Sequence, residues 1–323
     1  MYAVQAQRAG GPEVLEYVEV NDPTPGEGEV LVDVKATGMN FIDTYRRSGI
    51  YPMQFPHIPG TEGSGVISQV GDGVTNFQVG DRVAWHDSFG SYAQKVVTKA
   101  DMLVPVPDDI DFDTAAAILL QGLTAHYLVT DSHRIESGQT ALVHAAAGGV
   151  GLLLTQLITH MGGTVIGTVS TEEKAQLARE AGAQHVFLYG EGVDIAQTVR
   201  DLTDEEGVHV VYDGVGKDTF DASLDSLRVR GSLVVFGGAS GQVPPFDVQR
   251  LNSAGGVFLS RPSLQWFVRT PEELRERSEV LFTGLKEGWL KFRVGATFPL
   301  DKAADAHRAL EGRKTTGKVV LKA

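Results

Sequence analysis

The chain has 323 residues, of which 42% are hydrophobic and 21% charged, as in a folded globular protein and unlike a disordered one. Its formal net charge of −13 argues against a nucleic-acid partner and against binding to anionic membranes. It contains no cysteine, which excludes disulfides, thiolate nucleophiles, iron–sulfur clusters and cysteine-based zinc sites. We find neither a signal-peptide pattern nor a run of about 18 apolar residues, and we expect a cytoplasmic protein.

The first third of the chain is predicted to be rich in β-strands. Strand composition covers residues 14–20 and 29–35, with a turn at PTPGEGE between them. VLVDVKATG alternates apolar and polar residues, as a half-buried strand does. The stretch from IPGTEGSG to VGDRVAW contains short β-branched runs closed by glycine, which indicates a barrel-like β body.

The middle third alternates strands and helices. Apolar strands are predicted over residues 140–146 and 164–169, separated by a helix that ends at Gly162 and Gly163. Further strands are predicted over HVFLY, GVHVVYDGV and SLVVFGG, and helices over EEKAQLAREAG, VDIAQTVRDLT and DTFDASLDSLRVRG. Repeated strand–helix units of this kind predict a doubly wound parallel sheet.

The last part of the chain is mixed again. Strands are predicted over GGVFLS, LKFRVGATF and GKVVLKA, and helices over residues 272–287 and DKAADAHRALEG. We therefore expect an α/β protein with two domains. The parallel-sheet domain, residues 125–263, is inserted into a β-rich domain made of residues 1–124 and 264–323.

The most specific motif is HAAAGGVG, residues 144–151, which follows an apolar strand and opens a helix. Glycines at such a junction allow a tight turn and close approach of a pyrophosphate, and the N–H groups at the helix start attract the anion. We assign these roles to Gly148, Gly149, Val150 and Gly151. The alternative is a purely structural turn, against which the four following strand–helix units argue.

The end of the next strand decides which dinucleotide binds. NAD sites usually carry an acidic residue there, which binds the ribose 2′-hydroxyl. This chain has Ser170 instead, and Lys174 follows about one helical turn later, so that both can face a 2′-phosphate. Because a charge-assisted hydrogen bond is worth roughly 1.5–3 kcal/mol, we predict NADPH as the cofactor. The alternative is that Lys174 is a solvated lysine beside Glu172 and Glu173.

Motifs spread over nearly the whole chain point to a known family. They are GGPEVLE, ATGMNFIDTYRRSGIYP, PGTEGSGVI, VGDRVA, QGLTAHYL, HAAAGGVG, VVYDGVG, SRPSLQ and TTGKVVL. On these motifs the chain resembles the zeta-crystallin-type quinone oxidoreductases of the medium-chain dehydrogenase/reductase superfamily. The resemblance implies a GroES-like catalytic domain with an inserted Rossmann domain, and transfer of reducing equivalents from NADPH to a quinone or another electrophilic acceptor.

The resemblance also implies an active site without zinc. Where zinc dehydrogenases of the superfamily place Cys and His ligands, this chain has Asn40 and Thr61, although the glutamate is retained as Glu62. Without cysteine or a paired histidine, no typical zinc ligand set remains.

The NFIDTY segment is implied to lie beside the nicotinamide. Asn40, Phe41 and Tyr45 are then expected to contact the cofactor or the acceptor. Tyr45 either donates a proton to the acceptor or only packs against the cofactor. Tyr51 is expected at the mouth of the catalytic pocket, where simple wall packing is the alternative role.

Further cofactor contacts are implied residue by residue, each with a surface charge or an ordinary turn as its alternative. They are Thr124, Tyr189, Phe236, Gly237, Ser240, Arg261 and Arg313. The resemblance also implies a homodimer formed through the edge strand at Val257–Ser260.

Two other functions remain open. The first is an NADPH-dependent enal or enone reductase, because the same hydride geometry serves an activated alkene. The second, of another class, is a cofactor-binding crystallin-like or RNA-binding protein. The net charge of −13 argues against RNA, and the intact glycine loop argues against a purely structural role.

Overall fold

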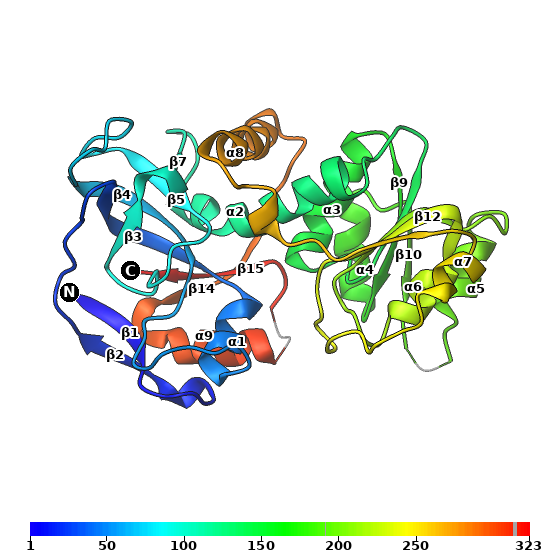
Figure 1. Cartoon of the computed structure of the whole chain (residues 1–323), viewed down its shortest axis with the longest axis horizontal. Helices are drawn as coiled ribbons and strands as arrows, with labels where there is room; N and C mark the ends of the chain where they lie inside the picture. The colour runs from blue at the N-terminus through cyan, green and yellow to red at the C-terminus, as the bar shows by residue number, and fades with distance from the viewer. Residues whose placement is uncertain (191, 313–314) are drawn as a thin grey trace. The chain divides into compact units, whose positions relative to one another are not determined.

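The computed structural model describes residues 1–190, 192–312 and 315–323, which form two compact units. Unit 1 comprises Met1–Leu123, Val268–Lys286 and Phe292–Ala323, and unit 2 comprises Thr124–Phe267 and Glu287–Lys291. Unit 1 therefore contains both chain ends, coloured blue and red in Figure 1. The division into functional domains stays a prediction. It assigns residues 1–124 plus 264–323 to one domain and residues 125–263 to the other.

Unit 1 is rich in strands, as the first third of the sequence predicts. Its strands are β1 (Tyr2–Ala6), β2 (Leu15–Glu19), β3 (Glu29–Met39), β4 (Glu62–Val70), β5 (Arg82–Trp85), β6 (Lys95–Lys99), β7 (Val104–Pro105), β14 (Val294–Pro299) and β15 (Lys318–Lys322). Its helices are α1 (Phe41–Ser48), most of α2 (Phe112–Tyr127), most of α8 (Pro271–Glu287) and α9 (Ala303–Glu311). Single 3-10 turns cover Pro12–Val14, Ala100–Met102 and Leu300–Lys302.

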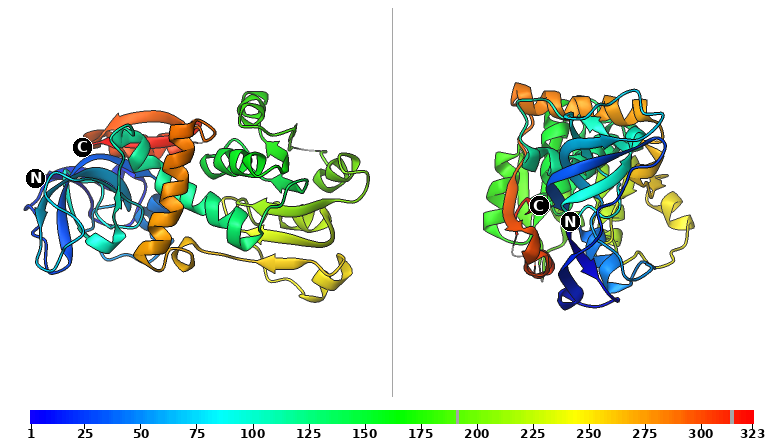
Figure 2. Two further views of the ribbon diagram at one scale, coloured as in Figure 1. Left: turned by 90° about the horizontal axis from the view of Figure 1, so that it is seen from above. Right: turned by 90° about the vertical axis from the view of Figure 1, so that its left-hand side faces the viewer.

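The main sheet of unit 1 joins the two ends of the chain. Its strand order is β14-β15-β3-β4-β5-β7, and β6 also pairs with β3. The last strand, β15, runs antiparallel to β3 with Val319 opposite Met39, and the two lie side by side in Figures 1 and 2. Consequently Lys318, at the start of β15, lies near Asn40, just after the end of β3.

Unit 2 is the α/β unit. Its strands are β8 (Thr140–Val143), β9 (Thr164–Val169), β10 (His185–Leu188), β11 (Val208–Asp213), β12 (Leu227–Val235) and β13 (Phe258–Ser260). Its helices are α3 (Gly149–His160), α4 (Glu172–Glu180), α5 (Ile195–Asp201), α6 (Phe220–Asp225) and α7 (Gln249–Ser253), with a π-helical turn at Leu128–Ser132 and a 3-10 turn at Leu264–Trp266.

All six strands of the unit 2 sheet are parallel, in the order β10-β9-β8-β11-β12-β13. The predicted doubly wound sheet is thereby confirmed. From β8 the chain winds outward through β9 to β10, whereas from β11 it winds the other way through β12 to β13. Ligands of such sheets bind at the carboxyl ends of the strands where this direction reverses, here β8 and β11.

One predicted helix ends earlier than expected. The helix over DTFDASLDSLRVRG stops at Asp225, and Leu227–Val235 forms β12 instead. Leu227, Leu233 and Val235 belong to the buried core of unit 2, so burial in the sheet outweighs the helical pattern. No helix within the described residues is apolar and long enough to span a bilayer.

Candidate active site

The glycine loop lies at the carboxyl end of β8, where the strand direction reverses. Gly148 is the N-cap of α3, and no side chain from the described residues caps this helix end. A Cβ atom on Gly151 would lie 2.3 Å from the carbonyl oxygen of Ala145, so only glycine allows the helix to start so close to the strand. Ala145 itself has a φ of 51°, a strained value for a residue with a side chain.

These features suit a pyrophosphate. The uncapped N–H groups at the start of α3 can donate to phosphate oxygens, and the absence of side chains lets the anion reach the backbone. Gly148, Gly149, Val150 and Gly151 are brought together here, as their predicted role requires. The residues present therefore fit a dinucleotide.

Ser170 and Lys174 meet at the carboxyl end of the neighbouring strand β9. The Nζ atom of Lys174 donates to the Oγ atom of Ser170 over 3.1 Å. Glu172 forms an ion pair with Arg179, with 2.5 Å between its Oε1 and the Nη1 of Arg179. The strand end thus presents an ammonium and a hydroxyl, the pair that a 2′-phosphate requires.

The other predicted cofactor residues of unit 2 follow the same sheet edge. Phe236 and Gly237 come directly after β12, and the backbone N–H of Tyr189, just after β10, donates to Val169 O over 3.0 Å. The hydroxyl of Ser240 donates to Val215 O over 2.9 Å, tying two loops together. Arg261, after β13, donates to Phe236 O over 3.3 Å.

Two predicted contacts lie elsewhere. Thr124 lies in α2 and begins unit 2. Arg313 falls outside the described residues. The structure therefore brings together the loop, strand-end and turn residues of unit 2, while the roles of Thr124 and Arg313 stay predictions.

A buried network of hydrogen-bonded polar side chains supports this sheet edge, and sequence analysis did not identify it. Asp213, at the end of β11, accepts from the hydroxyl of Ser223 over 2.8 Å and from backbone Val215 N over 2.8 Å and Gly216 N over 2.9 Å. Ser223 Oγ lies 2.9 Å from Nε2 of His144, whose Nδ1 lies 3.0 Å from Thr168 Oγ1.

The proton positions along this series of hydrogen bonds follow from its acceptors. Because Ser223 gives its proton to Asp213, Nε2 of His144 must carry a hydrogen that it donates to Ser223. Nδ1 then accepts from the hydroxyl of Thr168. Burial lowers the pKa of His144, against the opposing attraction of Asp213, so the ring is held neutral beside the glycine loop.

In unit 1, aromatic side chains line up on and after α1. The ring centroid of Tyr45 lies 6.4 Å from that of Phe41 and 5.9 Å, edge to face, from that of Tyr51. Phe41 is 45% exposed and Tyr51 is 44% exposed, so both rings keep open surface. Partial burial, with a smaller contribution from Tyr51, raises the pKa of Tyr45, which keeps its hydroxyl protonated at neutral pH.

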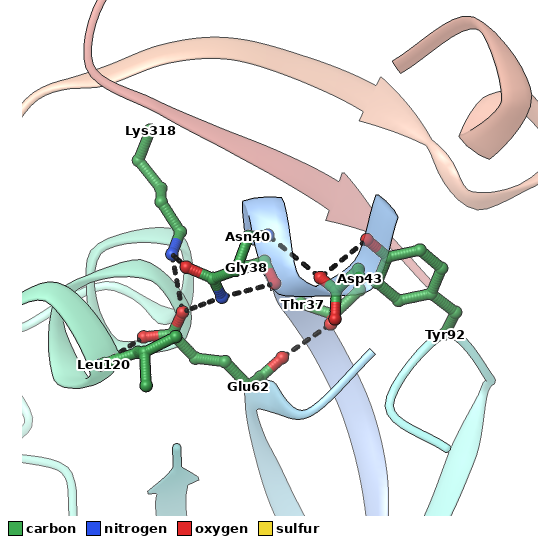
Figure 3. A network of polar contacts seen from close by, with 8 residues as sticks. All are labelled: Thr37, Gly38, Asn40, Asp43, Glu62, Tyr92, Leu120 and Lys318. Carbon is green, nitrogen blue, oxygen red and sulfur yellow. Dashed lines mark hydrogen bonds and ion pairs between the residues drawn. The ribbon is translucent and has the colours of Figure 1, made fainter. Parts of the chain in front are cut away.

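Asn40 takes part in a buried ionic network just before α1, shown in Figure 3. The Nζ atom of Lys318 donates to Asn40 Oδ1 and to Glu62 Oε2, each over 2.6 Å. Asn40 Nδ2 donates to the same Glu62 oxygen over 2.9 Å, and Leu120 N donates to Oε1 of Glu62 over 2.7 Å.

The network continues to Asp43 in the first turn of α1. Asp43 Oδ2 accepts from Asn40 N over 2.9 Å and from the hydroxyl of Tyr92 over 3.2 Å. Burial raises the pKa of Asp43 to about 6, against the lowering effects of the Asn40 N–H and the Lys318 charge. Lys318 stands out in the sequence as one of the two lysines that flank the apolar residues of β15, but its partners could not be predicted.

Glu62, the one residue of the zinc pattern that this chain retains, is thus neutralised by an ammonium. Within the described residues, no three His, Cys, Asp or Glu side chains are grouped so that they could hold a metal ion. The carboxylate of Glu62 therefore has the ammonium of Lys318 as its internal cation.

Comparisons with known proteins agree with this architecture. Residues 26–108 match the family model of the alcohol dehydrogenase GroES-like domain, and residues 149–276 match that of the zinc-binding dehydrogenases. The chain is 44% identical to a quinone oxidoreductase of Pseudomonas aeruginosa over 98% of both chains. It is 42% identical to a 2-haloacrylate reductase of a Burkholderia species, over 99% of this chain and 98% of that one.

Solved structures are similar over their full length. Mycobacterial Rv1454c complexed with NADPH matches with a TM-score of 0.96 and 50% identity, covering 100% of both chains. Escherichia coli quinone oxidoreductase complexed with NADPH matches with a TM-score of 0.96 and 42% identity, again covering 100% of both chains.

Proposed function

The chain belongs to the zeta-crystallin-type quinone oxidoreductases of the medium-chain dehydrogenase/reductase superfamily, and we propose that it reduces quinones with NADPH and without zinc. The observation that carries the proposal is the row of partly exposed rings formed by Phe41, Tyr45 and Tyr51. Flat, electron-poor acceptors stack on such rings, and a protonated tyrosine can donate to a quinone oxygen.

NADPH suits the residues of unit 2. The glycine loop fits the pyrophosphate, and Ser170 with Lys174 fits the 2′-phosphate. The same cofactor is bound in the related mycobacterial and Escherichia coli structures. Once bound, NADPH supplies a hydride, and an electrophilic acceptor needs little activation beyond proximity and orientation.

The chain's own residues then have limited tasks. Lys174 and the start of α3 hold the negative charges of the cofactor, and Tyr45 offers its hydroxyl to the acceptor. His144 and Asp213 keep the loops of unit 2 in place. Tyr51 covers one edge of the Tyr45 ring and limits its contact with water.

A panel of acceptors tests this function. Oxidation of NADPH and of NADH is followed with a naphthoquinone, a phenanthrenequinone and a short enal. We expect turnover with the quinones, and a lower KM for NADPH than for NADH. Activity with the enal alone would keep the family and contradict quinone reduction; NADPH binding without any turnover would favour a non-enzymatic, crystallin-like role.

Reduction of an activated alkene that bears a carboxylate is the second candidate function, and Arg46 favours it. Its guanidinium lies 4.6 Å from the centre of the Phe89 ring, and its Nη1 is buried with no hydrogen-bond partner among the described residues. Such a group binds carboxylates. If it does so here, Arg46→Gln raises the KM for 2-chloroacrylate and leaves the KM for a naphthoquinone unchanged.

We also propose a cytoplasmic homodimer. β13 is the edge strand of the unit 2 sheet, and Phe258 on it is 65% exposed. An unpaired edge next to a large exposed ring favours pairing with a second copy of the chain. Sedimentation of the wild type and of Phe258→Asp, which replaces the exposed ring by a charge, tests this pairing. The net charge of −13 argues against a nucleic-acid partner.

A further inference from the structure

The ion pair between Lys318 and Glu62 takes no direct part in the proposed reaction, yet it is enclosed in unit 1. The Lys318 side chain is 1% exposed and that of Glu62 is 0% exposed. A buried pair is weak evidence for stability alone, because loss of water around both charges offsets their attraction. The ion pair can instead serve to orient neighbouring groups.

The group oriented most strictly is the amide of Asn40 (Figure 3). Lys318 can only donate, so the amide oxygen must face it, and the Glu62 carboxylate can only accept, so the amide nitrogen must face that side. The observed contacts are Lys318 Nζ to Asn40 Oδ1 at 2.6 Å and Asn40 Nδ2 to Glu62 Oε2 at 2.9 Å. Only one orientation of the amide satisfies both partners.

Asn40 in turn fixes the first turn of α1. It is the N-cap of this helix, its carbonyl accepts from Asp43 N over 3.0 Å, and its N–H donates to Asp43 Oδ2 over 2.9 Å. α1 is only eight residues long, so its direction depends strongly on this end. Tyr45 lies about one turn further along, where a tilt at the N-cap displaces its hydroxyl.

We propose that Lys318 is a positioning residue of the acceptor site: its ammonium, by holding the Asn40 amide against Glu62, fixes the start of α1 and thereby the Tyr45 hydroxyl. The consequence for turnover rests on the proposed function, whereas the consequence for α1 does not. The competing explanation is that Lys318 only neutralises Glu62.

The two explanations differ for the variant Glu62→Gln with Lys318→Met. This double change removes both charges at nearly constant volume, so a purely neutralising role predicts full recovery. The glutamine side chain that replaces Glu62 keeps an oxygen for Leu120 N but turns its NH₂ group toward Asn40. The amide of Asn40, which has also lost its ammonium donor, is then no longer held in its original orientation.

The experiment compares this double variant with the wild type, Lys318→Met and Lys322→Met. Lys322→Met is the matched control, because Lys322 lies on the same strand and pairs with Asp113 at the surface. For each protein we would measure kcat and KM with a naphthoquinone, the Kd for NADPH, and amide hydrogen exchange of residues 41–48 and 149–160.

For the double variant we expect kcat to fall about 3- to 10-fold, no more than loss of the Tyr45 hydroxyl itself would cause, while the Kd for NADPH stays constant. Exchange should accelerate in residues 41–48 and stay unchanged in 149–160, the helix of the glycine loop. Wild-type kcat together with wild-type exchange across residues 41–48 would overturn the proposal. If the wild type reduces no quinone, the proposed function fails, and the exchange data still decide the role of Lys318.

Discussion

The two units bury their polar side chains in different ways. Unit 1 balances the carboxylate of Glu62 with the ammonium of Lys318, so that two full charges are enclosed together. Unit 2 satisfies Asp213 with neutral donors only: two backbone N–H groups and the hydroxyls of Thr219 and Ser223. The first arrangement relies on one charged partner among the donors to Glu62, whereas the second shares one charge among neutral donors, so the two units should differ in their sensitivity to single substitutions.

The largest effect is expected from Lys318→Met. It leaves Glu62 charged and buried without its counter-ion, which typically lowers the free energy of unfolding by about 3–5 kcal/mol. Urea unfolding measures this, with Lys322→Met as the surface control. A loss no larger than that of the control would remove the distinction between the units.

The pH dependence of stability should have opposite signs at Asp43 and His144. Burial raises the pKa of Asp43 from 3.8 to about 6, so its contribution is full below pH 4 and is lost as the pH rises through 6, by up to about 3 kcal/mol. The lowered pKa of His144 makes stability fall as the pH drops below about 6.5, its unfolded value.

Two variants isolate these contributions. Relative to the wild type, Asp43→Asn should gain stability as the pH rises from 4 to 6 (the window between the usual and the raised pKa). His144→Gln should gain stability relative to the wild type as the pH falls below about 6.5. Unfolding curves of each variant at several pH values measure the differences, and equal signs at the two sites would refute the assignment.

Asp213→Asn tests whether the hydrogen-bond network of unit 2 loses less stability on substitution than the ion pair of unit 1. The substitution keeps the shape but removes the charge that four donors share, and we expect about 1.5–3 kcal/mol lower stability. The Kd for NADPH should rise in parallel, because the loops after β8 and β11 form the cofactor edge. Weaker folding with unchanged NADPH binding would separate this network from the cofactor site.

Lys174→Ala addresses the surface of the same unit. Loss of one charge-assisted contact with the 2′-phosphate should raise the KM for NADPH about 10- to 100-fold and leave that for NADH nearly unchanged. Glu173→Ala, its exposed neighbour, is the control. An equal effect on both cofactors would exclude the 2′-phosphate role.

Tyr45→Phe should give the smallest effect. Removal of one neutral hydrogen bond to the acceptor lowers kcat by about 3- to 10-fold, with the aromatic stacking retained. Steady-state kinetics with a naphthoquinone measures it. Unchanged kcat would limit Tyr45 to packing.

Local features of the fold are the ones that the sequence predicts well. The glycine loop and the pairing of Ser170 with Lys174 are local, since strand, turn and helix follow one another within a few residues. Their geometry follows from general rules for parallel sheets, and the structure agrees with it. The pairing of Ser170 with Lys174 at the end of β9 could be predicted without knowledge of the rest of the chain.

Long-range partners could not be predicted in this way. Asn40 and Lys318 are 278 residues apart, and they meet only because β15 pairs with β3 in a particular register. Sequence analysis accordingly predicted a contact of Asn40 with the cofactor or acceptor, which stays a prediction, but could not predict that Lys318 and Glu62 hold its amide. The helix expected to run to Gly231 ended at Asp225 for a similar reason, because sheet burial is not visible locally.

We propose quinone reduction by NADPH in a protein whose Glu62 is paired with Lys318 rather than with a metal ion. The most direct test is the rate of NADPH oxidation by a naphthoquinone after exhaustive dialysis against a chelator, with the metal content measured. We expect the full rate in protein that contains far less than one metal ion per chain. A lost rate that zinc restores would contradict the account.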